Sequence, residues 1–416
     1  MAAYDIDRVR SLYPALSEGL VHLDGPGGTQ VAAPVIDAVA GTLRSAVSNR
    51  HGPFVSSRRA DAIVDAARVA AADLVGGQPH GVVLGPSMTA LTFRLADALG
   101  ATWEPGDEVV VSRLDHDANV RPWVLAAQRA GATVRWADID PVTCELPAAQ
   151  YDALIGERTR LVALTAASNA VGTRPDVAAV ARRAHAAGAL VAVDGVHATP
   201  HAPIDMAGLG ADVYAFSAYK LGGPHLGVLV ADPGLLGILH PAKLAPSTDD
   251  VPDRFETGTP AFELLAGLTA MVDHVADLAP ESAPDSAPET AAHAAAAGSG
   301  RRERVLASMT AVEAYEAELF ERLLTGLGGL PAVTLYGAAR DRTPTAAFRI
   351  DGRTPREVTE HLGAAGICAW DGDYYAYELM TRLGLRESGG AVRVGLAHYS
   401  TAAEVDRLLE CLNGVR

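Results

Sequence analysis

The chain has 416 residues, of which 34 are Lys or Arg and 50 are Asp or Glu, giving a formal net charge of −16. This length can form one large domain and a smaller one, and 49% hydrophobic with 20% charged residues is typical of a globular protein with a sizeable core. An acidic chain without a basic run argues against nucleic acid as a partner. The N-terminus lacks a secretion signal and no apolar run is long enough to span a membrane, so we expect a cytoplasmic protein.

Two amphipathic helical patterns, at 33–47 and 58–76, precede a stretch in which short β-branched runs alternate with alanine-rich helical runs. Strands are expected at 81–84, 108–112, 133–137, 160–165, 189–193, 213–216 and 226–230. The alternation predicts an α/β fold with a mostly parallel seven-stranded sheet covered by helices. In such sheets ligands bind at the carboxyl ends of the strands, so the residues just after each strand are the candidates for chemistry.

The C-terminal part has its own α/β pattern. After a helix at 261–278, residues 278–300 are rich in Pro, Ser, Ala and Glu, which predicts a low-complexity, mobile surface insertion. A long helix at 302–326 follows, then strands at 332–336, 345–350, 366–370 and 391–395 and helices at 355–364, 375–384 and 401–414. We therefore predict an N-terminal segment (1–32), a large domain (33–277), the insertion (278–300) and a small domain (301–416).

The turn between the last two strands of the large domain carries a lysine, Lys220, among several glycines. An ammonium beside apolar strand ends is costly unless it is paired, deprotonated or bound as an imine, which is how a Schiff-base lysine becomes reactive. A surface lysine on a hairpin explains this stretch equally well by itself.

Polar residues also follow the neighbouring strands. Ser87 and Thr89 open a helix after the first strand, where free amides and hydroxyls suit a phosphate, although Ser87 also reads as a plain N-cap. His116 can stack on a planar ring, and Asn169 can donate an amide hydrogen bond or close a turn. Asp194 ends an apolar strand, where a carboxylate is costly unless it meets a cation such as a protonated pyridine nitrogen. Together these loops predict pyridoxal 5′-phosphate, held as an imine on a lysine.

The chain resembles the class V aminotransferases, the fold-type I pyridoxal phosphate enzymes that include the cysteine desulfurases. The resemblance covers nearly the whole chain apart from 278–300. It is carried by the motifs VHLDGPGGTQV, LDHDANVRPW, ASNAVGT, VDGVHATPH, FSAYKLGGPHLGVL, RFETGTP and VRVGLAHYSTAAEV.

The resemblance implies a role for each matching residue. Lys220 would carry the cofactor, Asp194 would pair with the pyridine nitrogen and His116 would stack on the ring; these three form the catalytic set. The residues near the ring's phenolic oxygen and the phosphate would be Ser87, Met88, Thr89, Asn169, His197 and Ser217. Thr259 would reach the phosphate of the neighbouring subunit, which implies a homodimer. Arg393 would bind the α-carboxylate of an amino acid substrate, with Gly27, Asn169 and Tyr375 also in the substrate site.

The sequence departs from the desulfurases at three positions. His197 stands where they usually carry Gln, and Tyr219 where many have His. Their catalytic cysteine lies on a small-domain loop, and the corresponding segment GICAWDGDYYAYELM places Tyr375 at that position. The chain has three cysteines, Cys144, Cys368 and Cys411, whose wide spacings without CxxC indicate neither a disulfide framework nor a zinc site, and Cys368 falls within the expected strand 366–370.

The expected function is therefore that of a desulfurase-like enzyme that cleaves a C–S bond in a cysteine-type amino acid, by elimination rather than through an enzyme persulfide. Transamination and epimerisation by the same type of site are the alternatives. A non-catalytic scaffold is a further alternative, against which Lys220, Asp194 and Arg393 argue, because a scaffold needs no carboxylate-binding arginine beside an imine site.

Overall fold

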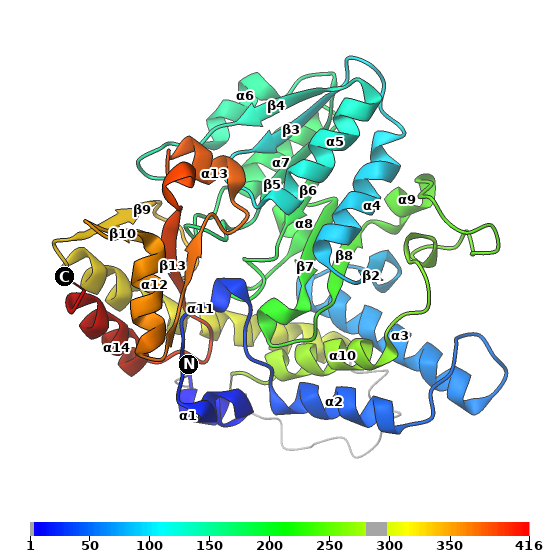
Figure 1. Cartoon of the computed structure of the whole chain (residues 1–416). Helices are drawn as coiled ribbons and strands as arrows, with labels where there is room; N and C mark the ends of the chain where they lie inside the picture. The colour runs from blue at the N-terminus through cyan, green and yellow to red at the C-terminus, as the bar shows by residue number, and fades with distance from the viewer. Residues whose placement is uncertain (1–3, 280–297, 416) are drawn as a thin grey trace.

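The structure, a computed structural model, describes residues 4–279 and 298–415 and is built around a seven-stranded sheet in the order β2-β8-β7-β6-β5-β3-β4 (Figure 1). The strands are β2 (Val82–Gly85), β3 (Glu108–Ser112), β4 (Thr133–Ala137), β5 (Thr159–Thr165), β6 (Leu190–Asp194), β7 (Val213–Ser217) and β8 (Gly227–Ala231). The neighbours from β7 to β4 are parallel, and β8 runs antiparallel to both β7 and β2. The predicted seven-stranded, mostly parallel sheet is confirmed.

Both faces of this sheet are covered, because successive strand residues point to opposite sides. Val110 and Val162 pack on one face in a core shared with helices α3, α7 and α10, whereas Val109 and Leu161 pack on the other face with α4 and α5. The helices of this part are α2 (Ala33–Arg44), α3 (Val55–Val75), α4 (Met88–Gly100), α5 (Arg121–Ala130), α6 (Tyr151–Leu154), α7 (Val177–Ala186), α8 (Met206–Leu209), α9 (Pro233–Ile238) and α10 (Phe262–Ala276).

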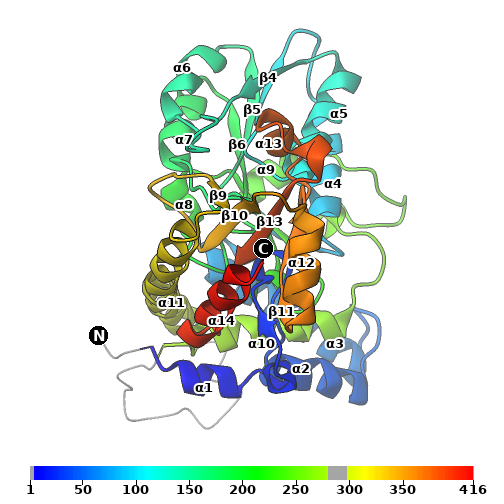
Figure 2. The same cartoon turned by 60° about the vertical axis from the view of Figure 1, so that its left-hand side comes forward.

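A smaller antiparallel sheet, in the order β12-β13-β10-β9, packs against the C-terminal helices (Figure 2). Its strands are β9 (Val333–Tyr336), β10 (Thr345–Ile350), β12 (Trp370–Gly372) and β13 (Ala391–Gly395). The helices of this part are α11 (Gly298–Gly328), α12 (Pro355–Ala364), α13 (Tyr377–Arg382) and α14 (Ala402–Asn413). The N-terminal segment, with α1 (Ile6–Ser11) and β1 (Val21–His22), joins this part through a parallel pair between β1 and β11 (Ile367–Cys368).

Two sequence-based expectations in this part were wrong. The strand expected at 366–370 is two strands, because β11 pairs with β1 whereas β12 pairs with β13. The helix expected to begin at 375 begins at Tyr377, because Tyr374 and Tyr375 both have positive φ, 54° and 58°. Most of the expected mobile insertion, 280–297, lies outside the described residues. Among the residues that the structure describes, no helix is both long enough and apolar enough to cross a membrane.

Gly390 allows a close approach between the strand β12 and the turn before β13. Its φ is +72°, and a Cβ there would lie 1.9 Å from the carbonyl oxygen of Gly372, whereas Gly352, with φ +74°, has no atom within 4 Å of its Cβ position. We expect Gly352→Ala to cost about 1 kcal/mol of unfolding free energy for the left-handed backbone alone, and Gly390→Ala to cost at least about 2 kcal/mol more. Urea denaturation measures both, and equal losses would contradict the close approach.

Candidate active site

A cavity of about 900 Å³ lies where the parallel strands end. Thr165, Asp194 and Ser217, the last residues of β5, β6 and β7, line it. Eleven of the thirteen predicted site residues line this cavity: Gly27, Met88, Thr89, His116, Asn169, Asp194, His197, Ser217, Lys220, Tyr375 and Arg393. The sheet therefore brings together side chains that are far apart in the sequence, at the edge where ligands bind in parallel sheets.

Lys220 projects into the cavity from a 3-10 turn, Ala218–Leu221, that directly follows β7. Its Nζ donates a short hydrogen bond to the carbonyl oxygen of Pro26 and lies 5.0 Å from the ring centroid of Tyr219. Burial, together with the nearby cation of Arg393, lowers the pKa of the amine to about 7. A substantial fraction of this amine is therefore neutral near pH 7, as a nucleophile or base requires.

Asp194 is buried at the end of β6, with 4% of its surface exposed. Burial raises the pKa of its carboxyl group to about 6, although the backbone N–H of Val196 donates a 2.8 Å hydrogen bond to Oδ1 and Lys220 attracts the anion. Among the described residues, no Lys, Arg or His forms an ion pair with it at 4.0 Å or less. Such a carboxylate is stabilised by any cationic group that enters the cavity.

His116 presents a neutral ring to the cavity. Burial, together with the charges of Lys220 and Arg393, lowers its pKa to about 4. The backbone N–H of Ala118 donates to Nδ1 at 3.0 Å, which leaves the ring proton on Nε2. The ring also stacks on Tyr375, with centroids 5.4 Å apart and an interplanar angle of 26°. A neutral, hydrogen-bonded imidazole is suited to stacking on a planar ligand.

Arg393, on β13, is the anion-binding group of the cavity. It is 5% exposed, its Nη1 donates to the carbonyl oxygen of Asn169 at 2.9 Å, and its guanidinium lies 4.3 Å from the ring centroid of Tyr374. Burial lowers its pKa to about 10, so the group is still a cation at neutral pH. The Nε of Arg393 and the Oδ1 of Asn169 are buried without a hydrogen-bond partner in the described part of the chain. A ligand carboxylate would satisfy the guanidinium through two parallel hydrogen bonds.

The tyrosines at 374 and 375 form one rim of the cavity. The side-chain amide of Asn169 donates to the carbonyl oxygen of Tyr374 at 2.9 Å, and the backbone N–H of Asp117 donates to that of Tyr375 at 2.8 Å. The Tyr374 hydroxyl donates a short hydrogen bond to the carbonyl oxygen of Ala391. These hydrogen bonds attach the rim to both parts of the structure. Tyr375, which the resemblance predicted for the substrate site, is 73% exposed.

His197 and Gly27 also lie where the sequence predicted a site. His197 is buried, and its Nε2 lies 2.9 Å from the hydroxyl of Thr345 on β10. Burial holds its pKa well below the usual value, so the ring is neutral. At Gly27 a Cβ would lie 2.6 Å from Nε1 of Trp370, so any larger residue would require this indole to shift. The backbone of the glycine-rich N-terminal motif thus closely approaches a side chain of β12.

Ser87 and Thr259 do not line this cavity. Ser87 is the N-cap of α4 and accepts a 3.1 Å hydrogen bond from the backbone N–H of Ala90. Met88 and Thr89, the first two residues of α4, do line it. Thr259 is exposed and lines a second cavity, of about 620 Å³, which shares Phe93 with the first. The phosphate contacts predicted for Ser87 and Thr259 stay predictions.

The sequence analysis missed several polar residues of the cavity. Arg121 and Asp117 form an ion pair at 3.1 Å, and Arg121 also lies 3.6 Å from Glu378. Asp371 and Asp373, from the segment around β12, face the same space. The motifs that carry Arg121 and Asp373 were recognised, but nothing in their spacing indicated that the two segments meet.

Comparison with known proteins places the whole arrangement in a family. The family model for aminotransferase class-V matches residues 21–297 and 289–408. The chain belongs to the class V aminotransferase family. It is 39% identical to the uncharacterized protein MT3887 of Mycobacterium tuberculosis, over 99% of each chain, and 32% identical to a cysteine desulfurase of Dickeya dadantii, over 99% of this chain and 97% of the relative.

A crystal structure of the cysteine desulfurase CsdA from Escherichia coli has the same fold, with a TM-score of 0.84 and 26% identity, covering 99% of this chain and 98% of that one. This member of the class V aminotransferase family therefore has the fold-type I architecture of pyridoxal phosphate enzymes, and the predicted family and fold are confirmed. Members of the family depend on pyridoxal phosphate. The cavity fits such a group, because it holds a depressed-pKa amine, a buried carboxylate without a cationic partner and a neutral imidazole.

The depressed pKa of Lys220 can be measured, because the sequence contains only one other lysine, Lys243. In cofactor-free protein, the acylation rate of Lys220 should rise with pH and level off just above its pKa of about 7, because only the neutral amine reacts. An amine with the ordinary pKa of about 10.4 becomes steadily more reactive up to that value. Mass spectrometry of the two lysine peptides gives both rates, and a Lys220 rate that still rises steeply above pH 9 would contradict a buried amine.

Proposed function

We propose that this family member is a pyridoxal phosphate enzyme that cleaves the C–S bond of a cysteine-type amino acid by elimination. The observation that supports elimination is the composition of the cavity. It contains an amine, an arginine without a carboxylate partner and a rim of tyrosines, whereas Cys144, Cys368 and Cys411, all within the described residues, do not line it. A persulfide-forming desulfurase needs a thiol beside the substrate, and elimination does not.

The residues proposed to hold the cofactor are those that the family resemblance implies, and all but Ser87 and Thr259 line the cavity. Lys220 would be the covalent attachment point, Asp194 would pair with the ring nitrogen and His116 would stack on the ring. The phenolic oxygen and the phosphate are assigned to Asn169, His197, Ser87, Met88, Thr89 and Ser217, with Thr259 supplied by a neighbouring subunit in a homodimer. When bound, the cofactor acts as an electron sink that makes the α-proton of an amino acid acidic.

Arg393 would orient the substrate. Its guanidinium binds the α-carboxylate bidentately, and the Tyr374 ring below it fixes the plane of the group. The substrate's side chain would then point toward the exposed side of the cavity, where Trp370 and Tyr375 are 53% and 73% exposed. This orientation would leave room beside Trp370 and Tyr375 for a sulfur leaving group and its substituent.

Lys220 would move the proton. Once its amine is free, Nζ removes the α-proton, and a pKa of about 7 is well matched to a base at neutral pH. The bond between Cβ and sulfur breaks and its electrons leave with the sulfur, which is released as sulfide or a thiol. The remaining three-carbon fragment is hydrolysed to pyruvate and ammonia.

Purified holoprotein mixed with cysteine, cystine and cysteine conjugates tests this proposal. From cysteine and its conjugates we expect pyruvate and sulfide or thiol in equal amounts, and from cystine we expect pyruvate and free cysteine persulfide in equal amounts. Turnover of cysteine should leave no persulfide on the protein. The triple variant Cys144→Ser, Cys368→Ser, Cys411→Ser should keep this activity, and Lys220→Ala should lose at least about 10³-fold in rate, because the base is removed.

Other outcomes separate the alternatives. Alanine in place of pyruvate, with a persulfide on the wild-type protein that is absent from the cysteine-free variant, would overturn elimination in favour of a persulfide route. If no pyruvate forms, amino transfer to a keto acid would identify an aminotransferase, and deuterium wash-in at Cα without net reaction would identify an epimerase. A protein that takes up no cofactor, with no visible absorption after pyridoxal phosphate is added, would support a scaffold.

Arg393→Lys keeps the charge but loses the planar fork. We expect kcat/KM to fall about 10- to 100-fold, which corresponds to about 1.4–2.8 kcal/mol, mainly through a higher KM, because one charge-assisted hydrogen bond to the carboxylate is lost. Steady-state kinetics measure the change, and an unchanged cofactor absorption spectrum shows that the cavity is intact. An unaltered KM would remove Arg393 from the substrate site.

A further inference from the structure

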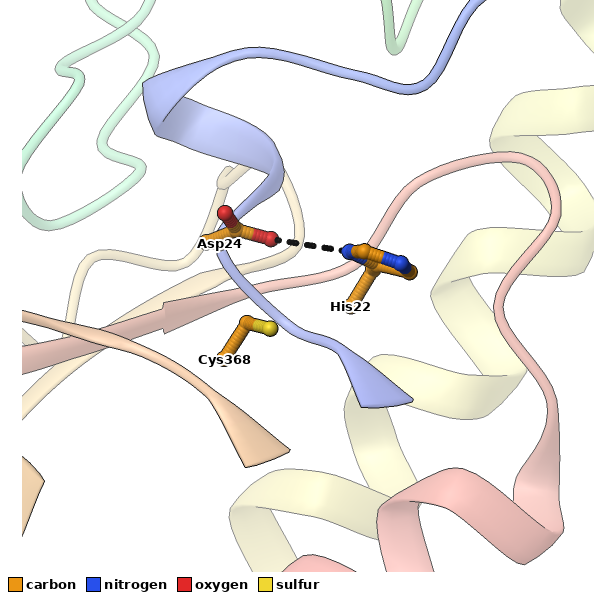
Figure 3. Close-up of side chains that lie close together, drawn as sticks. All are labelled: His22, Asp24 and Cys368. Atoms are coloured by element: carbon orange, nitrogen blue, oxygen red, sulfur yellow. Dashed lines mark ion pairs between the residues drawn. The ribbon is translucent and has the colours of Figure 1, made fainter. Parts of the chain in front are cut away.

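The N-terminal strand carries a cluster of three potential metal ligands outside the active-site cavity. In the parallel pair of β1 and β11, His22 lies opposite Cys368, and Asp24 follows His22 by two residues. Figure 3 shows the carboxylate of Asp24, the imidazole of His22 and the thiol of Cys368 close together, from two segments that are far apart in the chain. The strand register, not a local motif, creates this cluster.

The three donor atoms are close enough to bind one ion. A nitrogen of His22, a carboxylate oxygen of Asp24 and the sulfur of Cys368 all lie within 4.8 Å of one another, and Nδ1 of His22 is 3.7 Å from Oδ1 of Asp24. Tetrahedral zinc with bonds of about 2.0–2.3 Å needs donor separations of roughly 3.3–3.7 Å. The nitrogen–oxygen distance is at the upper end of this range, and because no donor separation exceeds 4.8 Å, shifts of about 1 Å would complete the set.

A buried oxygen in this cluster lacks a partner. Among the described residues, Oδ1 of Asp24 accepts no hydrogen bond. Nε2 of His22 is also buried and has no hydrogen-bond partner there. The His22 side chain is only 10% exposed and that of Asp24 26% exposed, so water does not easily reach them. A cation between the carboxylate and the imidazole removes the cost of the unsatisfied oxygen.

Gln30 can supply a fourth donor. Its side-chain amide lies beside His22, with Nε2 3.2 Å from Nδ1. A half-turn of this amide exchanges the positions of its nitrogen and oxygen, which are nearly equivalent in shape. The oxygen then lies at about the distance from Nδ1 that two ligands of one tetrahedral ion have.

We propose that His22, Asp24 and Cys368 bind a zinc-type divalent metal, with Gln30 or water as the fourth ligand. Imidazole, thiolate and carboxylate together suit zinc better than magnesium or calcium, which prefer oxygen ligands. The ion replaces the thiol proton, which passes to the buffer. It joins β1 to β11 just before the turn Gly25–Gly27, whose residues Pro26 and Gly27 line the active site. The proposal is independent of the proposed reaction.

Cobalt binding to the chelator-treated full chain tests the site. We expect one equivalent of Co²⁺ per chain to produce a thiolate-to-cobalt charge-transfer band, which Zn²⁺ then removes by displacement. Cys368→Ser should abolish the band, whereas Cys411→Ser, which changes another partly exposed thiol, should keep it. Zn²⁺ should also raise the Tm of the wild-type chain, by an amount that is lost in Asp24→Asn.

The outcomes decide the proposal whether or not a variant is destabilised. A band that persists in Cys368→Ser, or the absence of a band in the wild-type chain, would overturn the site. If Cys368→Ser does not fold, Asp24→Asn replaces it, because a ligand role predicts at least about tenfold weaker Co²⁺ binding with the band position shifted. Equal affinity in Asp24→Asn and wild type would likewise overturn the proposal.

Discussion

Burial of charged groups in one cavity is the constraint on which this structure depends. Lys220 and Arg393 are both cations in ordinary surroundings, and the fold places them together with Asp194 where water is largely excluded. The guanidinium keeps its charge because its intrinsic pKa is so high, so the amine of Lys220 is the group that gives up its proton. A lysine amine that is partly neutral near pH 7 beside a fixed cation is thus a consequence of packing.

Both sheets contribute residues to this cavity. Asp194 and Lys220 belong to the parallel strands, whose carboxyl ends coincide, whereas Arg393 comes from the antiparallel sheet. Hydrogen bonds cross between the two parts, from His197 to Thr345 and from Arg393 to the backbone of Asn169. Each crossing bond involves a residue that also lines the cavity, so the geometry of the site and the attachment of the two sheets are set by the same contacts.

The sequence predicted the parallel sheet well because its evidence is local. Runs such as 108–112 and 160–165 are continuous and apolar, as strands buried on both faces must be, and the polar residues after them fall at one edge by geometry alone. The part around 366–377 was predicted poorly because its structure depends on distant partners. Ile367 and Trp370 pair with different strands, and the left-handed tyrosines are held by Asp117 and Asn169. The meeting of His22 with Cys368 has the same origin, since their register is a tertiary contact.

The tyrosine rim links this last region to the chemistry. A left-handed conformation costs a non-glycine residue about 1–2 kcal/mol, and Tyr374 and Tyr375 adopt it in succession. The hydrogen bonds that their carbonyl oxygens accept from Asn169 and Asp117, and the stacking of Tyr375 on His116, offset that cost only while the rim is docked on the large sheet. To carry a reactive group from the cavity to an outside acceptor, this segment would have to break these contacts. The sulfur product of an elimination would instead have to leave by diffusion, past the exposed rings of Trp370 and Tyr375.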